Sequence, residues 1–204
     1  MGIWQAKKSQ AQRHPVFLEI LEETHGGVMI EVDSRIPSAT YTLFAGCPIA
    51  TCATQGQFMF IKTAQVTTAK ADGATAIAIE GPNLFKVGDF IGIEGMGAGT
   101  TATITVVTAT KIATALTNFT LTKGAIVYEA AADGATAPKY EPFGLLKNDT
   151  YVKEADGTTI YNATGSLVLR GAVAASNYPL PYGSIVKGHS PLSIRMRYVS
   201  TGDK

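Results

Sequence analysis

The side chains best suited to catalysis or metal binding are spread along the chain. The three histidines, His14, His25 and His189, lie far apart, and none has a cysteine or a carboxylate pair at the spacing of a metal site. Cys47 and Cys52 form a single C-x4-C pair, which argues against zinc. A disulfide between them would need an oxidising compartment, and the lack of an export signal favours free thiols. We therefore expect neither a metal site nor a cofactor.

Two polar loops resemble ligand sites only superficially. Residues 95–100 (GMGAGT) resemble a phosphate-binding loop, but no lysine follows, and an alternating strand replaces the helix that such a loop requires. Asp149, Glu154 and Asp156 surround a turn, and their spacing does not fit the twelve-residue calcium loop. No Gly-x-Ser-x-Gly elbow occurs either. A hairpin loop and a solvated turn are the favoured interpretations, and we do not expect an enzyme.

The composition limits the class of partner. The chain has 204 residues, with 17 Lys and Arg against 16 Asp and Glu, so the net charge of +1 attracts neither nucleic acid nor an anionic membrane. Only 16% of residues are charged, below the roughly 25% of an ordinary soluble domain. No run approaches the about 18 apolar residues of a membrane helix. Such an uncharged surface favours broad contact with neighbouring protein subunits.

The elements that must position these residues are mainly short β-strands. Period-two alternation is clearest at 74–80 (ATAIAIE), 101–108 (TATITVVT) and 192–199 (LSIRMRYV). Asp72-Gly73 predicts a hairpin turn. A short helix is predicted only from Pro15 to Glu23, because Phe17, Ile20 and Leu21 fit one helical face and Pro15 fits a first turn. We therefore predict a mostly β fold.

Changes in composition divide the chain into three parts. Residues 1–35 hold much of the chain's local charge, including Lys7, Lys8 and Arg13, together with a lone Trp4 and no hairpin partner, so they are interpreted either as an N-terminal arm or as a disordered tail. Residues 65–121 are almost purely Ala, Thr, Gly and β-branched, with enough strands for a small β-barrel or sandwich. We predict that this small domain is inserted into a β-rich body made of residues 36–64 and 122–204.

Three segments follow one another in the C-terminal part: 122–128 (TKGAIVY), 142–146 (PFGLL) and 167–173 (LVLRGAV). Their order resembles that of the lambda-type head decoration proteins, with a Lys/Arg-Gly start, a Gly-Ile-Leu segment and a Val-x-Val-x-Gly-x-Val strand. Chains with a VGD-containing insert like residues 86–89 (KVGD) also look like head-fibre or auxiliary capsid proteins of tailed phages. The long N-terminal segment and the insert depart from the minimal decoration pattern.

The resemblance implies a virion structural protein whose β-barrel, or β-tulip, body binds the major capsid protein on the outer capsid surface. It implies a homo-oligomer, with a trimer expected, that assembles in the host cytoplasm. The residues expected to contact the capsid are Trp4, Lys7, Lys8, Arg13 and Phe17. The alternative is a head-fibre protein whose inserted domain contacts the host surface or its glycans.

Overall fold

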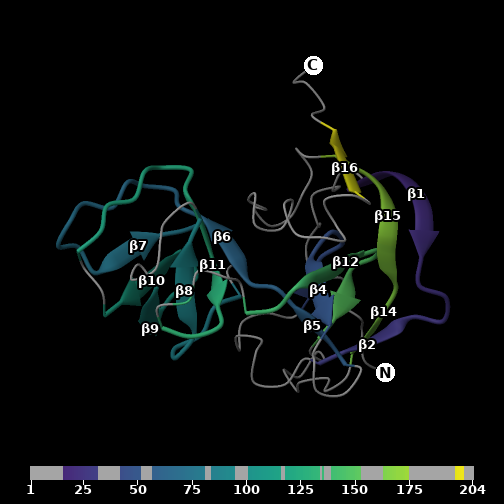
Figure 1. Ribbon diagram of the computed structural model, residues 1–204, viewed down its shortest axis with the longest axis horizontal. Coiled ribbons are helices and arrows are strands. Elements are labelled where there is room, and N and C mark those ends of the chain that lie inside the picture. The colour runs from purple at the N-terminus through teal and green to yellow at the C-terminus, as the bar shows by residue number, and fades with distance from the viewer. Residues whose placement is uncertain are drawn as a thin grey trace, which may run out of the picture.

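The computed structural model describes residues 16–31, 42–51, 57–80, 84–94, 101–115, 118–133, 135, 139–152, 163–174 and 196–199. These residues form sixteen β-strands and no helix, which confirms the mostly β prediction. The strands make an eight-stranded, a six-stranded and a two-stranded sheet. Figure 1 shows the two larger sheets as two lobes side by side, which we call the barrel lobe and the six-stranded lobe.

The barrel lobe is built from the two ends of the chain. Its strands are β1 (Phe17–Glu23), β2 (Val28–Ile30), β4 (Pro48–Thr51), β5 (Phe58–Phe60), β12 (Pro142–Leu146), β14 (Ala163–Gly165), β15 (Leu167–Ala174) and β16 (Met196–Val199). Their order is β1-β15-β12-β4-β5-β2-β14, and β16 pairs with β15 in parallel. β14 lies at one end of this order and β15 lies near the other end, yet only Ser166 separates the two strands in sequence. The sheet therefore curls back on itself.

A bent two-stranded ribbon closes this curl. β1 runs antiparallel to β15, and β2 runs antiparallel to β14. At the bend the Thr24 N–H donates to the Leu167 carbonyl oxygen, and the Leu167 N–H donates to Thr24 Oγ1, both at 2.9 Å. Gly26 and Gly27 take φ values of 79° and 77° there, a conformation that favours glycine.

The ribbon corrects two predictions for the leading part of the chain. The helix predicted from Pro15 to Glu23 is wrong, because β1 is a strand. The described part of the predicted arm 1–35 does not stand apart from the body, since β1 and β2 are both paired in the sheet. The physical reason is burial: Val16 belongs to a core cluster with Leu145, Val168 and Val173. Residues 1–15 and 32–35 lie outside the described residues.

The six-stranded lobe comes from the middle of the chain. Its strands are β6 (Thr63–Gln65), β7 (Ala76–Ala78), β8 (Phe90–Ile93), β9 (Ala102–Val107), β10 (Lys111–Thr114) and β11 (Ile126–Ala130), in the order β6-β11-β8-β9-β10-β7. A bridge between Val66 and Ile79 joins the residues that follow β6 and β7, so this sheet also closes. Most of the predicted insert, 65–121, lies within this lobe, and β6 and β11 extend the sheet beyond it on both sides.

Each lobe has its own hydrophobic core. The barrel lobe buries a cluster that includes Ile30, Ile49, Phe60, Leu146 and Leu167. The cluster of the six-stranded lobe shares no residue with it; its fully buried members include Ile77, Phe85, Ile91, Ile104, Ile112 and Val127. A small sheet of β3 (Thr42–Leu43) and β13 (Thr150–Tyr151) covers the barrel core through Leu43. The two clusters meet at Leu84, which lies between β7 and β8 in sequence but packs in the barrel cluster, while its neighbour Phe85 packs in the other cluster.

Candidate interaction surface

Strand β1 presents apolar side chains to solvent at the end of a sheet. Among the described residues it pairs only with β15, through Phe17, Glu19, Ile20, Glu22 and Glu23. Leu18 and Leu21 fall between paired positions, where the register shifts, and their exposed fractions are 49% and 59%. Ile20 is 39% exposed. An edge strand with such residues is a typical protein contact surface.

Acidic side chains surround this apolar strip. Glu19 and Glu22 are exposed, and Glu23 lies 2.5 Å from the Lys147 ammonium, measured from Oε2 to Nζ. A cleft of about 460 Å³ lies beside the strand. It is lined by Ile20, Leu21, Glu22, Glu23, His25 and Lys147. We call this combination of exposed leucines, glutamates and cleft the β1 surface.

The backbone of β1 lies very close to β15. A Cβ atom added at Gly171 would overlap the Glu19 carbonyl oxygen, so only glycine fits there without movement of the strand. At the start of the strand, the Ala174 N–H donates to the Val16 carbonyl oxygen at 2.8 Å. The β1 surface therefore lies on a paired strand rather than on a loop.

The residues expected to contact a capsid have two outcomes. Phe17 is half-buried and packs against the cluster of Val16, Leu145, Val168 and Val173. Phe17 therefore packs within the barrel lobe. The sequence did not predict this packing, because residues 1–35 were interpreted as an arm or a tail. Trp4, Lys7, Lys8 and Arg13 lie outside the described residues, and their role stays a prediction.

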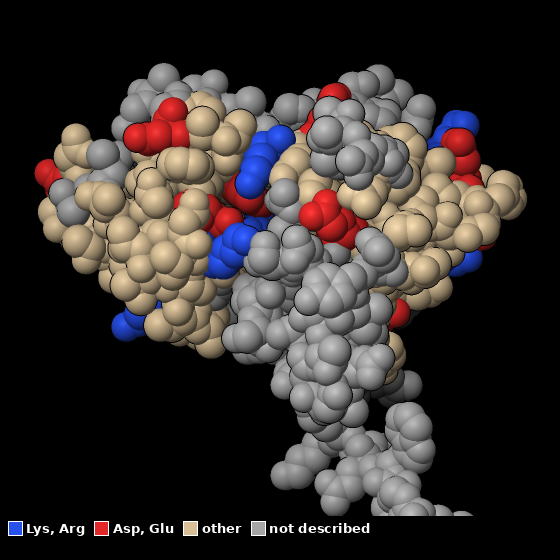
Figure 2. All heavy atoms as spheres, turned by 90° about the horizontal axis from the view of Figure 1, so that it is seen from below, with Lys and Arg blue, Asp and Glu red and all other residues tan. Residues whose placement is uncertain are grey.

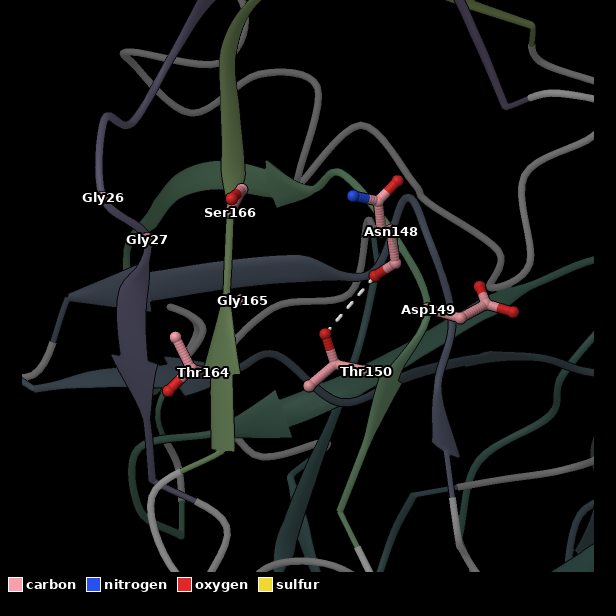
Figure 3. Close-up of a pocket in the computed structure, with 8 residues that line it drawn as sticks. All are labelled: Gly26, Gly27, Asn148, Asp149, Thr150, Thr164, Gly165 and Ser166. Atoms are coloured by element: carbon pink, nitrogen blue, oxygen red, sulfur yellow. Dashed lines mark hydrogen bonds between the residues drawn. The ribbon is translucent and has the colours of Figure 1, made fainter.

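A polar pocket of about 390 Å³ lies at the bend of the ribbon (Figure 3). It is lined by Gly26, Gly27, Asn148, Asp149, Thr150, Thr164, Gly165 and Ser166. Several of its polar groups already have partners: Asp149 Oδ1 accepts from the Ala45 N–H at 2.8 Å, and the Thr150 hydroxyl donates to the Asn148 carbonyl oxygen at 3.4 Å. No group of three metal-ligating side chains occurs among the described residues. Asp149, Glu154 and Asp156 were considered in the sequence as a calcium site. Asp149 instead accepts the hydrogen bond from the Ala45 backbone N–H, and Glu154 and Asp156 lie outside the described residues.

Charged side chains also gather where the two lobes meet. Figure 2 shows many of the charges on this face between the lobes, with uncharged surface over much of the rest. Lys62, on the link between β5 and β6, lies 2.5 Å from Asp89 Oδ2 and 3.8 Å from Glu129 Oε2. Lys139, on the return link from β11 to β12, lies 2.8 Å from Glu129 Oε1. Both links are thus held by carboxylates of the six-stranded lobe.

This junction cluster is structural in character. Lys62, Asp89 and Glu129 are all buried, and the cluster balances two ammonium groups against two carboxylates. Burial lowers the pKa of Lys62, while the charge of Glu129 and the hydrogen bond to Asp89 oppose that change. Asp89 Oδ2 also accepts the Lys86 N–H at 2.8 Å. Because each of these charges has a partner, the cluster fits a role in joining the lobes better than a role in catalysis.

Comparison with known proteins adds no identification. No family model, curated protein or solved structure matches the chain. No helix among the described residues is long and apolar enough to cross a membrane. Of the three segments that resemble decoration proteins, 142–146 and 167–173 form β12 and most of β15, which pair through Leu145 and Val168. The segment 122–128 belongs to the six-stranded lobe instead, where β11 pairs with β6 and β8.

Proposed function

We propose that this protein is a virion structural protein that binds the outer surface of a phage capsid and stabilises it. The observation that carries the proposal is the β1 surface, which offers exposed leucines on an edge strand paired with β15. Contiguous exposed apolar groups on a rigid scaffold are typical of protein–protein contact. Of the buried charged residues in the described part of the chain, Lys62, Asp89 and Glu129 serve the junction between the lobes, and Lys70 donates to the Phe119 carbonyl oxygen within the six-stranded lobe. The arrangement favours binding over chemistry.

A shell of repeated subunits is the kind of partner that suits this protein. Low charge and two curled sheets give a β-rich body with a large uncharged surface. Weak contacts made by several linked copies on one shell multiply through effective concentration. We therefore propose the major capsid protein as the partner, a homo-oligomer as the active form and the capsid exterior as the location.

Co-sedimentation with capsids tests this function. Purified protein is mixed with undecorated capsids of the phage that carries its gene, and binding and the capsid melting temperature are measured. We expect saturable binding and a higher melting temperature. The variant Leu18→Ser/Leu21→Ser should bind more weakly, while the control Val87→Ser, which changes an exposed valine of the other lobe, should bind as the wild type does. Failure of the wild-type protein to bind or to stabilise capsids would refute the proposal.

A head-fibre role is the second candidate, and one observation favours it. The six-stranded lobe has its own core and lies to one side of the barrel lobe (Figure 1). It exposes Thr105 and Val106 on β9. If this face binds a host glycan, Thr105→Glu/Val106→Glu should lower adsorption of decorated particles to cells and leave capsid binding intact. Unchanged adsorption would argue against it.

A further inference from the structure

We infer that the β1 surface is the docking site for residues 1–15 of a second copy of this chain. The inference goes beyond capsid binding, because it concerns how copies join each other. It deepens the proposed function, on which it rests in one respect: copies joined through β1 form the homo-oligomer that binds the capsid, so Leu18→Ser/Leu21→Ser would weaken capsid binding by separating the copies. Three features carry it: charge, apolar character and the direction of the chain.

Charge complementarity points to this occupant. The seven residues of β1 include Glu19, Glu22 and Glu23 and no basic residue. Glu23 is paired with Lys147, and Glu22 lies opposite Arg170 on β15, so the acidic character of the surface rests mainly on the exposed Glu19 and Glu22. Residues 1–15 contain Lys7, Lys8 and Arg13 and no acidic residue. Opposite charges on two surfaces steer their encounter and suppress wrong partners. By the same reasoning, two β1 strands would repel each other if they met edge to edge.

The apolar groups also match. Leu18, Ile20 and Leu21 are exposed along β1, next to the cleft of about 460 Å³. Residues 1–15 include Trp4, the only tryptophan of the chain. Tryptophan and arginine are the residues most enriched at the energetic centres of interfaces. We therefore assign Trp4 to the apolar strip and the basic side chains to the glutamates.

The course of the chain favours a second copy over the same copy. Val16 is buried, and its carbonyl oxygen is bonded to the Ala174 N–H, so the chain is committed to β15 from this residue on. A tight hairpin back onto β1 would have to turn at His14-Pro15. A two-residue type I′ turn needs positive φ values at both positions, which proline cannot adopt, so folding back within one copy would require a longer loop. Fifteen extended residues span about 50 Å, enough to reach a neighbouring molecule.

The predicted contact is head-to-tail, because the segment of one copy meets a different surface on the next. Contacts of this kind close into rings when the rotation between copies allows it. A ring of three copies would satisfy every β1 surface and every leading segment. This geometry gives the expected oligomer a specific physical basis.

Complementary charge reversal tests the inference without capsids. One variant carries Lys7→Glu/Lys8→Glu/Arg13→Glu, and the other carries Glu19→Lys/Glu22→Lys. We expect the wild-type mass in light scattering to be a multiple of 21.4 kDa, and each variant alone to dissociate at least about tenfold more readily, since attraction becomes repulsion. An equimolar mixture of the two variants should associate again, because each variant's segment is complementary to the other variant's β1; in a mixed ring of three, two of the three contacts are then attractive and one is repulsive.

Matched controls separate this contact from general charge effects. Glu80→Lys/Glu141→Lys makes the same charge change at two exposed glutamates away from β1, and it should leave the mass unchanged. Dilution of the wild-type protein should shift the Trp4 emission to longer wavelength, and Trp4→Ala should weaken association.

A wild-type monomer at all concentrations, an undiminished assembly of Glu19→Lys/Glu22→Lys, or a mixture that fails to reassociate would each overturn the inference. Capsid co-sedimentation of the same preparations is scored separately. A monomer that still binds capsids would overturn the inference alone, and an oligomer that ignores capsids would overturn the proposed function alone.

Discussion

Replacing Lys62 by methionine tests whether the junction cluster joins the two lobes as the distances indicate. Lys62 is buried and lies 2.5 Å from Asp89 Oδ2. Methionine fills a similar volume without a charge. Asp89 then keeps only the Lys86 N–H as a partner, while Glu129 keeps Lys139 at 2.8 Å. The substitution therefore leaves one buried carboxylate without its counter-charge.

The expected loss follows from that uncompensated charge. Breaking a buried ion pair by removing one partner costs about 3–5 kcal/mol. Removing both members costs much less, because no unpaired charge stays buried. Lys62→Met/Asp89→Asn should therefore be more stable than Lys62→Met alone, and within about 2 kcal/mol of the wild type. Lys147→Met is the matched control, since its ion pair with Glu23 joins side chains that are 32% and 35% exposed; it should cost about 1 kcal/mol or less.

Urea unfolding followed by far-UV circular dichroism measures these differences. With a slope of about 2 kcal/mol per molar urea, Lys62→Met should lower the midpoint by about 2 M. If the lobes unfold separately, the loss should appear in the transition of the six-stranded lobe, which contains Asp89 and Glu129. Additive costs of the two substitutions in the double variant would refute the reasoning, because they would mean that the pair is not coupled.

Three further predictions concern single residues. Burial lowers the pKa of Lys62 in the folded state below 10.5, so the unfolded chain keeps this proton to a higher pH than the folded protein does. The stability of the wild type relative to Lys62→Met should therefore rise as the pH increases toward 10.5, and urea midpoints measure this change. Burial raises the pKa of Cys47 to about 12, so in a Cys52→Ser variant this thiol should resist iodoacetamide at pH 8 when folded and react in urea; rapid native labelling would contradict this. Gly171→Ala should displace β1 through overlap with the Glu19 carbonyl, at a cost of about 2–4 kcal/mol, and hydrogen exchange of β1 amides should accelerate.

The strands of the six-stranded lobe could be predicted because their local patterns agree with their packing. Within the alternating segment 74–80, Ile77 and Ile79 are both buried, at 0% and 1% exposure, while Ala76 and Glu80 are exposed. Asp72-Gly73 forms the predicted turn, with Gly73 at a φ of 80°. Period two is reliable here because the bridge and ladder partners of this segment impose no register shift.

The N-terminal helix was predicted wrongly because register shifts changed the period of β1. Leu18 and Leu21 fall between residues that pair with β15. Leu18 and Leu21 are thus inserted between paired positions of β1, three residues apart. As a result, the apolar residues Phe17, Ile20 and Leu21 have the three- and four-residue spacing that is typical of a helical face. The pairing partner of β1 lies about 150 positions along the chain, so no local signal contradicted the helix. The exposed leucines of the β1 surface were missed for the same reason.

The junction cluster could not be predicted either, because its members are far apart in sequence. Lys62 and Asp89 are separated by 27 positions, and Glu129 lies in another strand, β11. Only the short contact between Asp89 and the Lys86 N–H is local. The cluster exists because two links of the chain cross the same end of the six-stranded lobe, which is a property of topology.

Salt distinguishes the two electrostatic features of this chain. With only 16% charged residues, the chain has few charges to place, and two groups of them occupy the lobe junction and the β1 surface. The junction charges are buried, so salt screens their interactions little. Glu19 and Glu22 are exposed, and salt screens their interactions strongly, because the screening length falls from about 10 Å at 0.1 M to about 3 Å at 1 M salt. Raising sodium chloride over this range should dissociate the assembly while leaving the urea midpoint of the monomeric Glu19→Lys/Glu22→Lys variant nearly unchanged. If the midpoint fell as steeply as the association, the junction cluster would be open to solvent, contrary to its geometry.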